Sequence, residues 1–285
     1  MSTRSSSNKA DARGRALITG GSGGIGGEFA RQLAGEGYAL LLVARNRDRL
    51  EQLARELRES CRAEVEILAA DLSRPDSLRI VEDRIAGDST LTLLVNCAGS
   101  APWGRFAELD LDRQEETIRL NVLAPVRLTR AALTGMLERG RGAIINVSSL
   151  AAFISLPFCA TYGGTKAYLA SFTEALHEEL RGTGVKVQAL CPGFTRTELF
   201  AREGADLSKI PAHAWVSPET VVRSSLAALR RDRAVCIPGF RFRLLALLLR
   251  LVPRSHVRRR VAAQFGRFDA LRLEEEPPSK ESRAG

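Results

Sequence analysis

A tyrosine and a lysine four residues apart, Tyr162 and Lys166, are the pair in this sequence best suited to acid–base chemistry. Side chains at positions i and i+4 of a helix are neighbours on one face, so the phenol and the ammonium would lie close together. A free phenol, with a pKa of about 10, is a weak base near neutral pH, but an adjacent cation favours the phenolate and lowers that pKa. Such a pair can move a proton to or from the oxygen of a ketone or secondary alcohol. The same spacing also occurs on ordinary surface helices, so other residues must decide between the two interpretations.

A serine hydroxyl at an expected strand end supports the chemical interpretation. Ser149 lies thirteen residues before Tyr162, just after an apolar run at 143–147 that is typical of a buried strand. Ligands of open parallel sheets bind at the carboxyl ends of the strands. A hydroxyl placed there can hydrogen-bond a substrate oxygen and stabilise its developing charge. Ser148 is the neighbouring alternative.

A glycine-rich segment at residues 19–26, Thr-Gly-Gly-Ser-Gly-Gly-Ile-Gly, follows the first apolar run. Glycines let the backbone turn sharply and let a pyrophosphate approach without a Cβ in the way. The helix that follows would offer free N–H groups and a partial positive charge to the phosphates. Glycine-rich turns can also be plain connections, but the position between the first strand and the first helix favours nucleotide binding.

Apolar runs alternate with helical patterns along most of the chain, which is typical of an α/β protein with a doubly wound parallel sheet. The expected strands are 16–19, 38–44, 65–69, 91–95, 143–147, 185–190 and 234–237. The expected helices are 26–35, 48–59, 78–85, 112–139, 162–180 and 218–230. We predict a disordered lead-in at 1–13, one domain at 14–238, an arginine-rich helical extension at 239–272 and a disordered tail at 273–285.

The net charge of +9 is unevenly distributed. Residues 230–272 contribute +10, whereas residues 16–229 come to −2, so the main body is unsuited to binding nucleic acid. No apolar run approaches the roughly 18–20 residues of a spanning helix, and residues 1–15 have no apolar stretch typical of a secretory signal. The five cysteines are scattered and no histidine has ligand spacing, so we expect a reducing, cytoplasmic location and no metal site.

Together these motifs resemble those of the short-chain dehydrogenase/reductase family in its single-domain form. The resemblance covers about residues 15–238 and includes the Thr-Gly-x-x-x-Gly-Ile-Gly turn, the Tyr-x-x-x-Lys pair, Asn-Cys-Ala-Gly at 96–99 and Pro-Gly at 192–193. Cys97 departs from the family, which usually has a second asparagine there. The resemblance implies a Rossmann fold and an enzyme that transfers a hydride between a nicotinamide cofactor and a ketone or secondary alcohol (EC 1.1.1.-).

The resemblance also implies individual roles. Ser149 orients the substrate oxygen, Tyr162 exchanges the proton, Lys166 tunes Tyr162 and binds the nicotinamide ribose, and Asn121 holds a water that links the lysine to solvent. Family spacing selects Ser149 over Ser148. The expected cofactor-binding residues are Thr19, Gly20, Ser22, Gly24, Ile25, Gly26, Arg45, Asp71, Leu72, Asn96, Ala98, Gly99, Tyr162, Lys166, Pro192, Gly193, Thr195 and Thr197.

The end of the second expected strand bears on the choice of cofactor. Ala44 stands where an acid would hold the ribose of NAD(H), and Arg45 follows it. A guanidinium suits a 2′-phosphate, so we predict NADP(H) rather than NAD(H), with Arg49 as a weaker helper; Arg45 as an ordinary solvated arginine is the alternative. Asp71 matches the family acid that binds the adenine amino group, or else it caps a helix before Pro75.

Two apolar regions bear on substrate and partners. Residues 153–158 and the expected lid at 198–217 are rich in apolar side chains and predict a lipophilic carbonyl substrate. An apolar helix at 240–252, then Pro253 and an arginine-rich helix, fits membrane-surface contact, a cover for the pocket, or packing in a dimer. This extension is similar to those of hydroxysteroid dehydrogenase and long-chain 3-oxoacyl reductase relatives. We expect a homo-oligomer; the alternative function is a cofactor-binding membrane or partner module with little turnover.

Overall fold

The computed structural model describes residues 13–203, 210–253 and 255–263. Residues 1–12 of the lead-in predicted at 1–13, the middle of the expected lid, residues 264–272 of the predicted extension and the predicted tail at 273–285 therefore lie outside the described residues. The centre of the fold is a sheet in the order β3-β2-β1-β4-β5-β6-β7, in which every neighbouring pair is parallel. The strands are β1 (Arg15–Thr19), β2 (Ala39–Ala44), β3 (Val65–Ala69), β4 (Leu91–Asn96), β5 (Gly142–Val147), β6 (Val185–Leu190) and β7 (Val235–Cys236).

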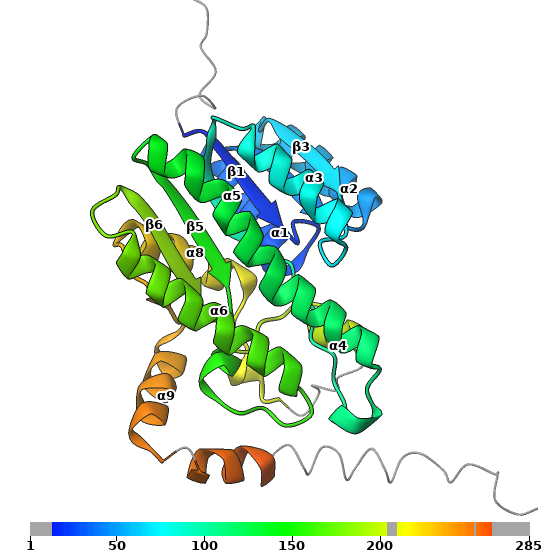
Figure 1. Cartoon of the computed structure of the whole chain (residues 1–285), viewed down its shortest axis with the longest axis vertical. Helices are drawn as coiled ribbons and strands as arrows, with labels where there is room; N and C mark the ends of the chain where they lie inside the picture. Colours follow the sequence, from blue (N-terminus) through cyan, green and yellow to red (C-terminus); the bar gives the residue numbers. More distant parts are fainter. Residues whose placement is uncertain (1–12, 204–209, 254, 264–285) are drawn as a thin grey trace, which may run out of the picture.

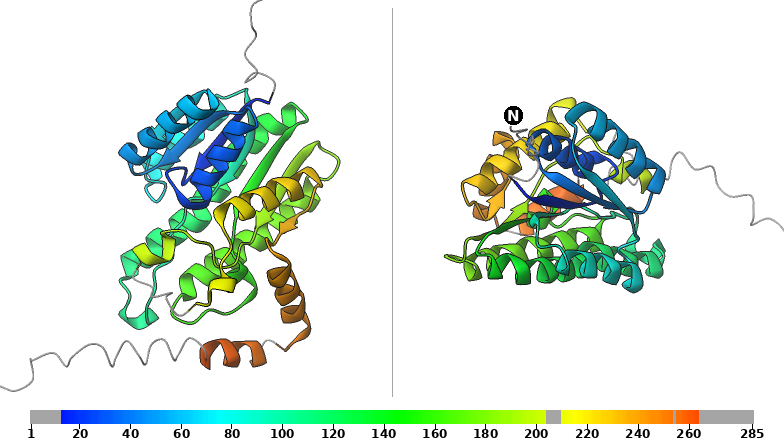
Figure 2. Two further views of the ribbon diagram at one scale, coloured as in Figure 1. Left: turned by 180° about the vertical axis from the view of Figure 1, so that it is seen from behind. Right: turned by 90° about the horizontal axis from the view of Figure 1, so that it is seen from above.

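Helices cover both faces of this sheet (Figures 1 and 2). One face packs against α1 (Gly24–Gly35), α2 (Arg47–Cys61) and α8 (Pro218–Arg230). The other packs against α3 (Pro75–Ala86), α5 (Ala124–Glu138) and α6 (Ala160–Glu179). Burial from two sides explains why strands such as β2, with the sequence ALLLVA, are continuous apolar runs. The predicted doubly wound parallel sheet is confirmed.

The strand order reverses between β1 and β4, because the chain runs outward from β1 to β3 and then returns to the other side of β1. In an open α/β sheet, a crevice forms at such a switch point, outside the carboxyl ends of the strands. The glycine-rich segment follows β1, residues 97–99 follow β4, and Ser149 follows β5. The topology thus brings all three to one edge of the sheet.

The predicted helix at 112–139 is interrupted, which corrects the expectation of a continuous element. It consists of α4 (Leu111–Ile118), a π-helical turn η3 (Arg119–Leu123) and α5. A π turn widens a helix by one residue and is frequent at functional sites. Here the turn carries Asn121, which is completely buried.

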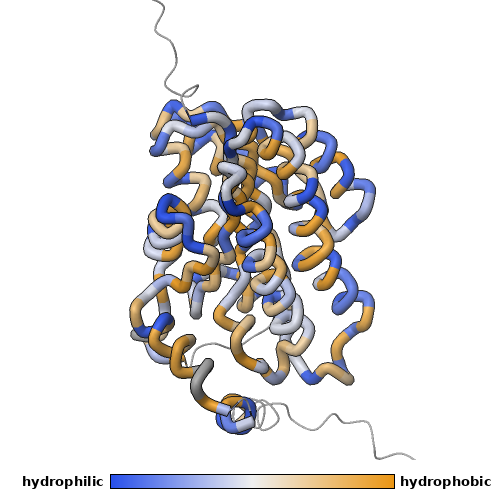
Figure 3. Tube along the Cα trace, turned by 60° about the vertical axis from the view of Figure 1, so that its left-hand side comes forward, coloured by the Kyte–Doolittle hydropathy of each residue, from blue (hydrophilic) through white to orange (hydrophobic). Residues whose placement is uncertain are grey.

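The C-terminal extension lies outside the layered body. Helix α9 (Phe240–Leu251) follows β7, and residues 255–263 form a further helical segment after Pro253. Both lie beyond the carboxyl end of the sheet, away from the first residue of β1 (Figures 1 and 2). Figure 3 shows that hydrophobic residues continue along α9, away from the core.

Candidate active site

A cleft of about 1290 Å³ runs along the carboxyl edge of the sheet. It extends from the end of β2 at Arg45, past the glycine-rich segment, to Ser149 and Phe200. Of the predicted cofactor residues, it is lined by Gly20, Ser22, Gly24, Ile25, Gly26, Arg45, Asp71, Leu72, Ala98, Gly99, Tyr162, Lys166, Pro192, Gly193, Thr195 and Thr197. Thr19, Asn96 and Asn121 do not line it.

The glycine-rich segment fits a bound pyrophosphate. Gly20 has φ +67°, and a Cβ on Gly26 would lie 2.3 Å from the carbonyl oxygen of Gly20, so neither position tolerates a side chain. Gly23 is the N-cap of α1 and makes no side-chain hydrogen bond, and a Cβ placed on it would meet nothing within 4 Å. Residues 23–26 also line the cleft, so the N-terminal turn of α1, whose first N–H groups have no partner within the helix, lies where a phosphate could bind.

Thr19 and Asn96 lie behind the cleft and hold the strand ends together. The hydroxyl of Thr19 accepts hydrogen bonds from the backbone N–H groups of Cys97 and Ala98, each at 3.0 Å. The amide of Asn96 donates to Asn146 Oδ1 at 2.8 Å. Both residues were predicted to bind cofactor; in the structure neither lines the cleft, and the Thr19 hydroxyl and the Asn96 Nδ2 group hold the strand ends around the turn after β4.

Asn146 is a positioning residue that the motifs did not single out. It lies in β5, directly opposite Asn96 in the parallel register, and its amide donates to Thr173 Oγ1 of α6 at 3.0 Å. The side chain is completely buried. This chain of hydrogen bonds ties β4 and β5 to the helix that carries Tyr162. A single asparagine within the apolar run AIINV was the available signal.

Ser149, Tyr162 and Lys166 meet in the cleft, at the end away from Arg45. Ser149 is the N-cap of the short helix η4 (Leu150–Phe153), where its Oγ accepts from the N–H of Ala151 at 3.1 Å. Tyr162 is buried on α6, and this burial raises its pKa, while a hydrogen bond with Ser149 acts in the opposite direction. Tyr162 is therefore a protonated phenol near neutral pH and is poised as a proton donor.

Lys166 is buried beside the tyrosine ring. Its Nζ donates to the carbonyl oxygen of Val147 at 2.8 Å and lies 5.6 Å from the ring centroid of Tyr162. Burial lowers the pKa of Lys166 to about 8. The predicted lowering of the Tyr162 pKa by Lys166 does not hold for the protein by itself, because desolvation of the phenol dominates.

Ser148 and Asn121 have structural partners. The hydroxyl of Ser148 donates to the carbonyl oxygen of Lys166 at 2.7 Å, so it fastens β5 to α6 and leaves Ser149 as the hydroxyl beside Tyr162. Asn121 Nδ2 donates to Thr165 Oγ1 at 3.1 Å. A Cβ on Gly99 would lie 3.1 Å from Asn121 Oδ1 and 3.6 Å from Lys166 Nζ, so both polar groups approach the side of Gly99 where a side chain would project.

Arg45 and Arg49, at the end of the cleft near β2, differ in their ion-pair partners. Arg45 is exposed, lines the cleft and has no acidic partner among the described residues. Arg49 also lines the cleft, but it is paired with Glu198 at 2.8 Å. The predicted helper is thus engaged by the lid, whereas Arg45 remains available to an anion.

Asp71 lies at the cleft but does not cap α3. Its Oδ1 accepts hydrogen bonds from the N–H and the hydroxyl of Ser73, at 3.0 and 2.7 Å, and this forms a turn. The N-cap position of α3 is Arg74, which makes no side-chain cap. The proposed capping role is therefore wrong, and the carboxylate retains a position facing the cleft.

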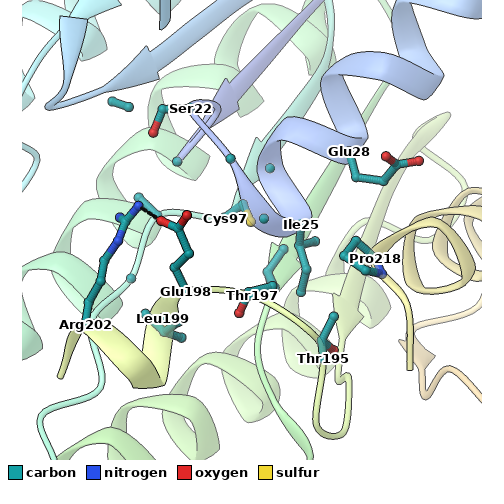
Figure 4. Close-up of a pocket in the computed structure, with 18 of the residues that line it drawn as sticks. Ser22, Ile25, Glu28, Cys97, Thr195, Thr197, Glu198, Leu199, Arg202 and Pro218 are labelled. Atoms are coloured by element: carbon teal, nitrogen blue, oxygen red, sulfur yellow. Dashed lines mark hydrogen bonds and ion pairs between the residues drawn. The ribbon is translucent and has the colours of Figure 1, made fainter. Parts of the chain in front are cut away.

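The segment after β6 closes over the glycine-rich turn. Thr197 Cγ2 would lie 3.2 Å from a Cβ on Gly24, which has φ +55°, so the two backbones approach closely. Figure 4 shows Thr197 beside Ile25, with Glu198 paired to Arg202 on the same segment. The short helix α7 (Leu199–Arg202) begins here, and Glu203 at its end binds Arg113 of α4 at 2.9 Å. The lid is thus attached to α2 and to α4 by ion pairs.

Aromatic side chains surround the tyrosine at the lid end of the cleft. Phe200 lies edge-on to Tyr162 with ring centroids 5.7 Å apart, and it also contacts Trp103 at 6.5 Å. Trp103 contacts Phe158, whose φ of +61° is strained for a non-glycine residue. Cys159 is buried in the same cluster, so packing is its role. Trp103 was missed by the sequence analysis because it lies in a loop without a motif.

The fold and the site define a class: an α/β oxidoreductase with a dinucleotide-binding turn and a Ser–Tyr–Lys constellation at the sheet edge. The family model for short chain dehydrogenases matches residues 15–208. The chain belongs to the short-chain dehydrogenase/reductase family and is an oxidoreductase acting on alcohol or ketone groups (EC 1.1.1.-). The expected family membership is confirmed.

Individual relatives agree with this assignment. The chain is 33% identical over 220 residues to the very-long-chain 3-oxoacyl-CoA reductase of Bos taurus, covering 75% of this chain and 68% of that protein. It resembles a short-chain dehydrogenase from Sphingobium yanoikuyae in complex with NADPH, with TM-score 0.76 and 32% identity over 95% of this chain and 99% of that one. A bulky-bulky ketone specific alcohol dehydrogenase from Comamonas testosteroni has TM-score 0.73 and 28% identity over 94% and 97% of the two chains.

Proposed function

We propose that this protein is an NADP(H)-dependent carbonyl reductase or alcohol dehydrogenase for lipophilic ketones and secondary alcohols. The observation that carries the proposal is the continuity of one cleft from the glycine-rich turn to the buried Tyr162 and Ser149. A dinucleotide bound along this cleft would end beside the two hydroxyl groups that handle the substrate oxygen.

The cofactor-binding residues divide the cleft by chemistry. The N–H groups at the start of α1 would hold the pyrophosphate, Asp71 the adenine amino group, and Lys166 the nicotinamide ribose. Arg45, which has no acidic partner among the described residues, would hold the 2′-phosphate that distinguishes NADP(H). The complex of the Sphingobium relative with NADPH supports this choice. A nicotinamide cofactor supplies or accepts the hydride in such a reaction.

The residues of this chain handle the proton. In the reducing direction, the Ser149 hydroxyl donates a hydrogen bond to the carbonyl oxygen and stabilises the negative charge that develops on it. Tyr162 transfers its phenolic proton to that oxygen, which gives the alcohol and a phenolate. The Lys166 ammonium, 5.6 Å from the tyrosine ring, stabilises the phenolate until a proton returns from solvent. In the oxidising direction the same proton moves back.

The lid end of the cleft favours an apolar substrate. Leu199, Phe200 and Trp215 line it, with Trp103 packed behind Phe200, and apolar walls with a few polar groups are typical of sites for lipophilic molecules. The relatives named for very-long-chain 3-oxoacyl-CoA and for bulky-bulky ketones support a large carbonyl compound. We further propose a cytoplasmic homo-oligomer, in keeping with exposed Leu123 and Tyr168 on the neighbouring elements η3 and α6.

The test is NADPH oxidation over a panel of 3-oxoacyl thioesters, steroids, retinoids and small ketones. For a compound that is reduced, Tyr162→Phe should lower kcat/KM by a factor of about 10²–10⁴, because the proton donor is removed. Tyr168→Phe is the matched control, since Tyr168 lies on the same helix and is exposed. Near-normal turnover by Tyr162→Phe would overturn the assignment. Cofactor binding without turnover on any compound would favour the alternative of a binding module.

A further inference from the structure

The extension is attached to the body beside the active site. Phe242 of α9 packs on the Pro-Gly turn after β6: a Cβ on Gly193 would lie 2.5 Å from the Phe242 ring. Ala246, one helical turn later, is buried, and α9 contacts η4, the short helix that begins at Ser149. One side of α9 therefore packs against the carboxyl edge of the sheet, where Ser149 and Tyr162 lie; we call this the catalytic edge. The opposite side of α9 faces outward.

The outward side of α9 is apolar and exposed. Phe240 is 72% exposed and Leu247 is 56% exposed. The described large apolar residues that are exposed along this stretch are Phe240, Leu244, Leu245, Leu247, Leu248 and Val252. Isolated apolar residues on a surface need no explanation, but a contiguous row on one helix marks an interaction site.

Cationic groups flank this row, and the described part of the extension contains no acidic residue. Arg241 and Arg243 of α9 are exposed, as are Arg258, Arg259 and Arg260 of the helical segment 255–263. The sequence contains no aspartate or glutamate between Asp232 and Asp269. Elsewhere on the molecule several exposed arginines are paired with acids, for example Arg31 with Glu56. The extension thus combines an apolar stripe with uncompensated positive charge.

We propose that α9 and segment 255–263 dock the protein on an anionic lipid surface, with the leucine stripe in the interface and the arginines at the headgroups. An apolar face bordered by basic residues is the pattern of helices that lie in the membrane interface. Self-association through this face is disfavoured, since it would bring two acid-free, arginine-rich surfaces together. Spanning is excluded for α9, whose 12 residues measure roughly 18 Å. None of the described helices is long and apolar enough to cross a membrane.

Docking through α9 orients the enzyme. Phe242 and η4 place the lipid-facing helix next to the turn after β6 and to Ser149, so the catalytic edge of the sheet faces the same side as the extension (Figure 1). A substrate dissolved in the bilayer would then reach the cleft over a short path. This consequence rests on the proposed function, whereas docking itself does not.

The test is flotation of the full-length protein with vesicles. We expect it to float with phosphatidylcholine vesicles that contain about one third phosphatidylserine, to remain unbound with phosphatidylcholine alone, and to be released by raised salt. The variant Arg258→Gln/Arg259→Gln/Arg260→Gln should lower the partition coefficient roughly a hundredfold, at about fivefold per arginine. Leu244→Ser/Leu248→Ser should lower it at least about tenfold.

Matched controls replace similar residues on the body. Arg47→Gln/Arg55→Gln/Arg181→Gln removes three exposed arginines, and Ile80→Ser/Leu137→Ser removes two exposed apolar side chains. Both should float like the original protein, and melting temperatures verify that every variant is folded. Absence of flotation, equal binding to neutral vesicles, or unchanged partition of the extension variants would overturn the proposal. The proposal would also be overturned if the protein did not bind lipid and Leu244→Ser/Leu248→Ser changed its sedimentation mass. The leucine stripe would then contact a second copy of the chain.

Discussion

The catalytic edge of the sheet and the C-terminal extension lie side by side, yet they are built in opposite ways. At the catalytic edge, Tyr162 and Lys166 are buried, and the polar atoms around them are hydrogen-bonded within the protein, as in Lys166 to Val147. In the extension, leucines and arginines are exposed. The Phe242 ring packs on the turn at Gly193, which lines the cleft.

The difference indicates that one region determines the reaction and the other determines where the protein binds. Buried polar groups are costly unless they are paired, so a site that keeps them fixes one geometry and one chemistry. An exposed apolar and cationic surface does not define a reaction, but it does define what the protein will bind. Changes at the catalytic edge should therefore alter turnover, and changes on the exposed side of the extension should leave the turnover of a water-soluble substrate intact.

The largest expected effect distinguishes the two adjacent serines. Ser149→Ala should lower kcat/KM by a factor of about 10²–10³, because a donor to the substrate oxygen is lost, with little change in melting temperature. Ser148→Ala should instead lower the free energy of unfolding by about 1–3 kcal/mol, because the hydroxyl bonded to Lys166 is lost. Steady-state kinetics and denaturation of both variants check this. The reverse pattern would reassign the substrate contact to Ser148.

The next effect measures the cost of burying Lys166. Its pKa falls from 10.5 in free solution to about 8 in the fold, so between these values the unfolded chain binds more protons and the free energy of unfolding rises with pH. At pH 7 the folded protein carries nearly the whole cost, about 3 kcal/mol, and about 2 kcal/mol of it is relieved by about pH 9.5. The stability of Lys166→Met relative to the original protein should fall by that amount over this range.

Denaturant titration of the ligand-free protein at the two pH values provides the measurement for Lys166→Met. Lys186→Met is the matched control, since Lys186 lies on β6 and bonds the carbonyl of Arg230 near the surface. A stability difference that does not change with pH would show that the ammonium is not desolvated.

A smaller effect concerns the cofactor end of the cleft. Arg45→Ala should raise the KM for NADPH by roughly ten- to thirtyfold and leave the KM for NADH unchanged, because it removes a charge-assisted contact to the 2′-phosphate. Arg47→Ala is the control, since Arg47 is paired with Glu51 and does not line the cleft. Equal use of NADH and NADPH by the original protein, with no effect of Arg45→Ala, would remove the phosphate role.

The smallest effect tests how the two regions are joined. Phe242→Ala should lower the free energy of unfolding by about 1–2 kcal/mol, because a half-buried ring no longer covers the turn at Gly193. Leu244→Ala should be neutral, since its side chain faces outward. Turnover of a small soluble ketone should stay within about twofold in Leu244→Ala. A loss of stability in Leu244→Ala comparable to that in Phe242→Ala would mean that the stripe packs on the body.

The sequence by itself determined the fold and the reaction class. Alternating apolar and helical patterns place the strands, since a buried parallel strand must be apolar on both faces. The glycine-rich turn and the pair Tyr162 and Lys166 identify the site, because turn geometry and i, i+4 spacing are local properties of the chain. Sixteen of the eighteen cofactor residues that the family resemblance implied line the cleft.

Tertiary structure decided what those residues do. Thr19 and Asn96 belong to the expected motifs, yet the Thr19 hydroxyl and the Asn96 Nδ2 group are hydrogen-bonded behind the cleft, which only the packing of β1, β4 and β5 reveals. Lys166 together with the oxidised nicotinamide was expected to lower the Tyr162 pKa; in the protein without cofactor, desolvation, which depends on every neighbour in space, raises it. The pairing of Arg49 with Glu198 and the seat of Phe242 on Gly193 join segments distant in sequence. Such contacts form only when folding brings distant segments together, so no local sequence pattern predicts them.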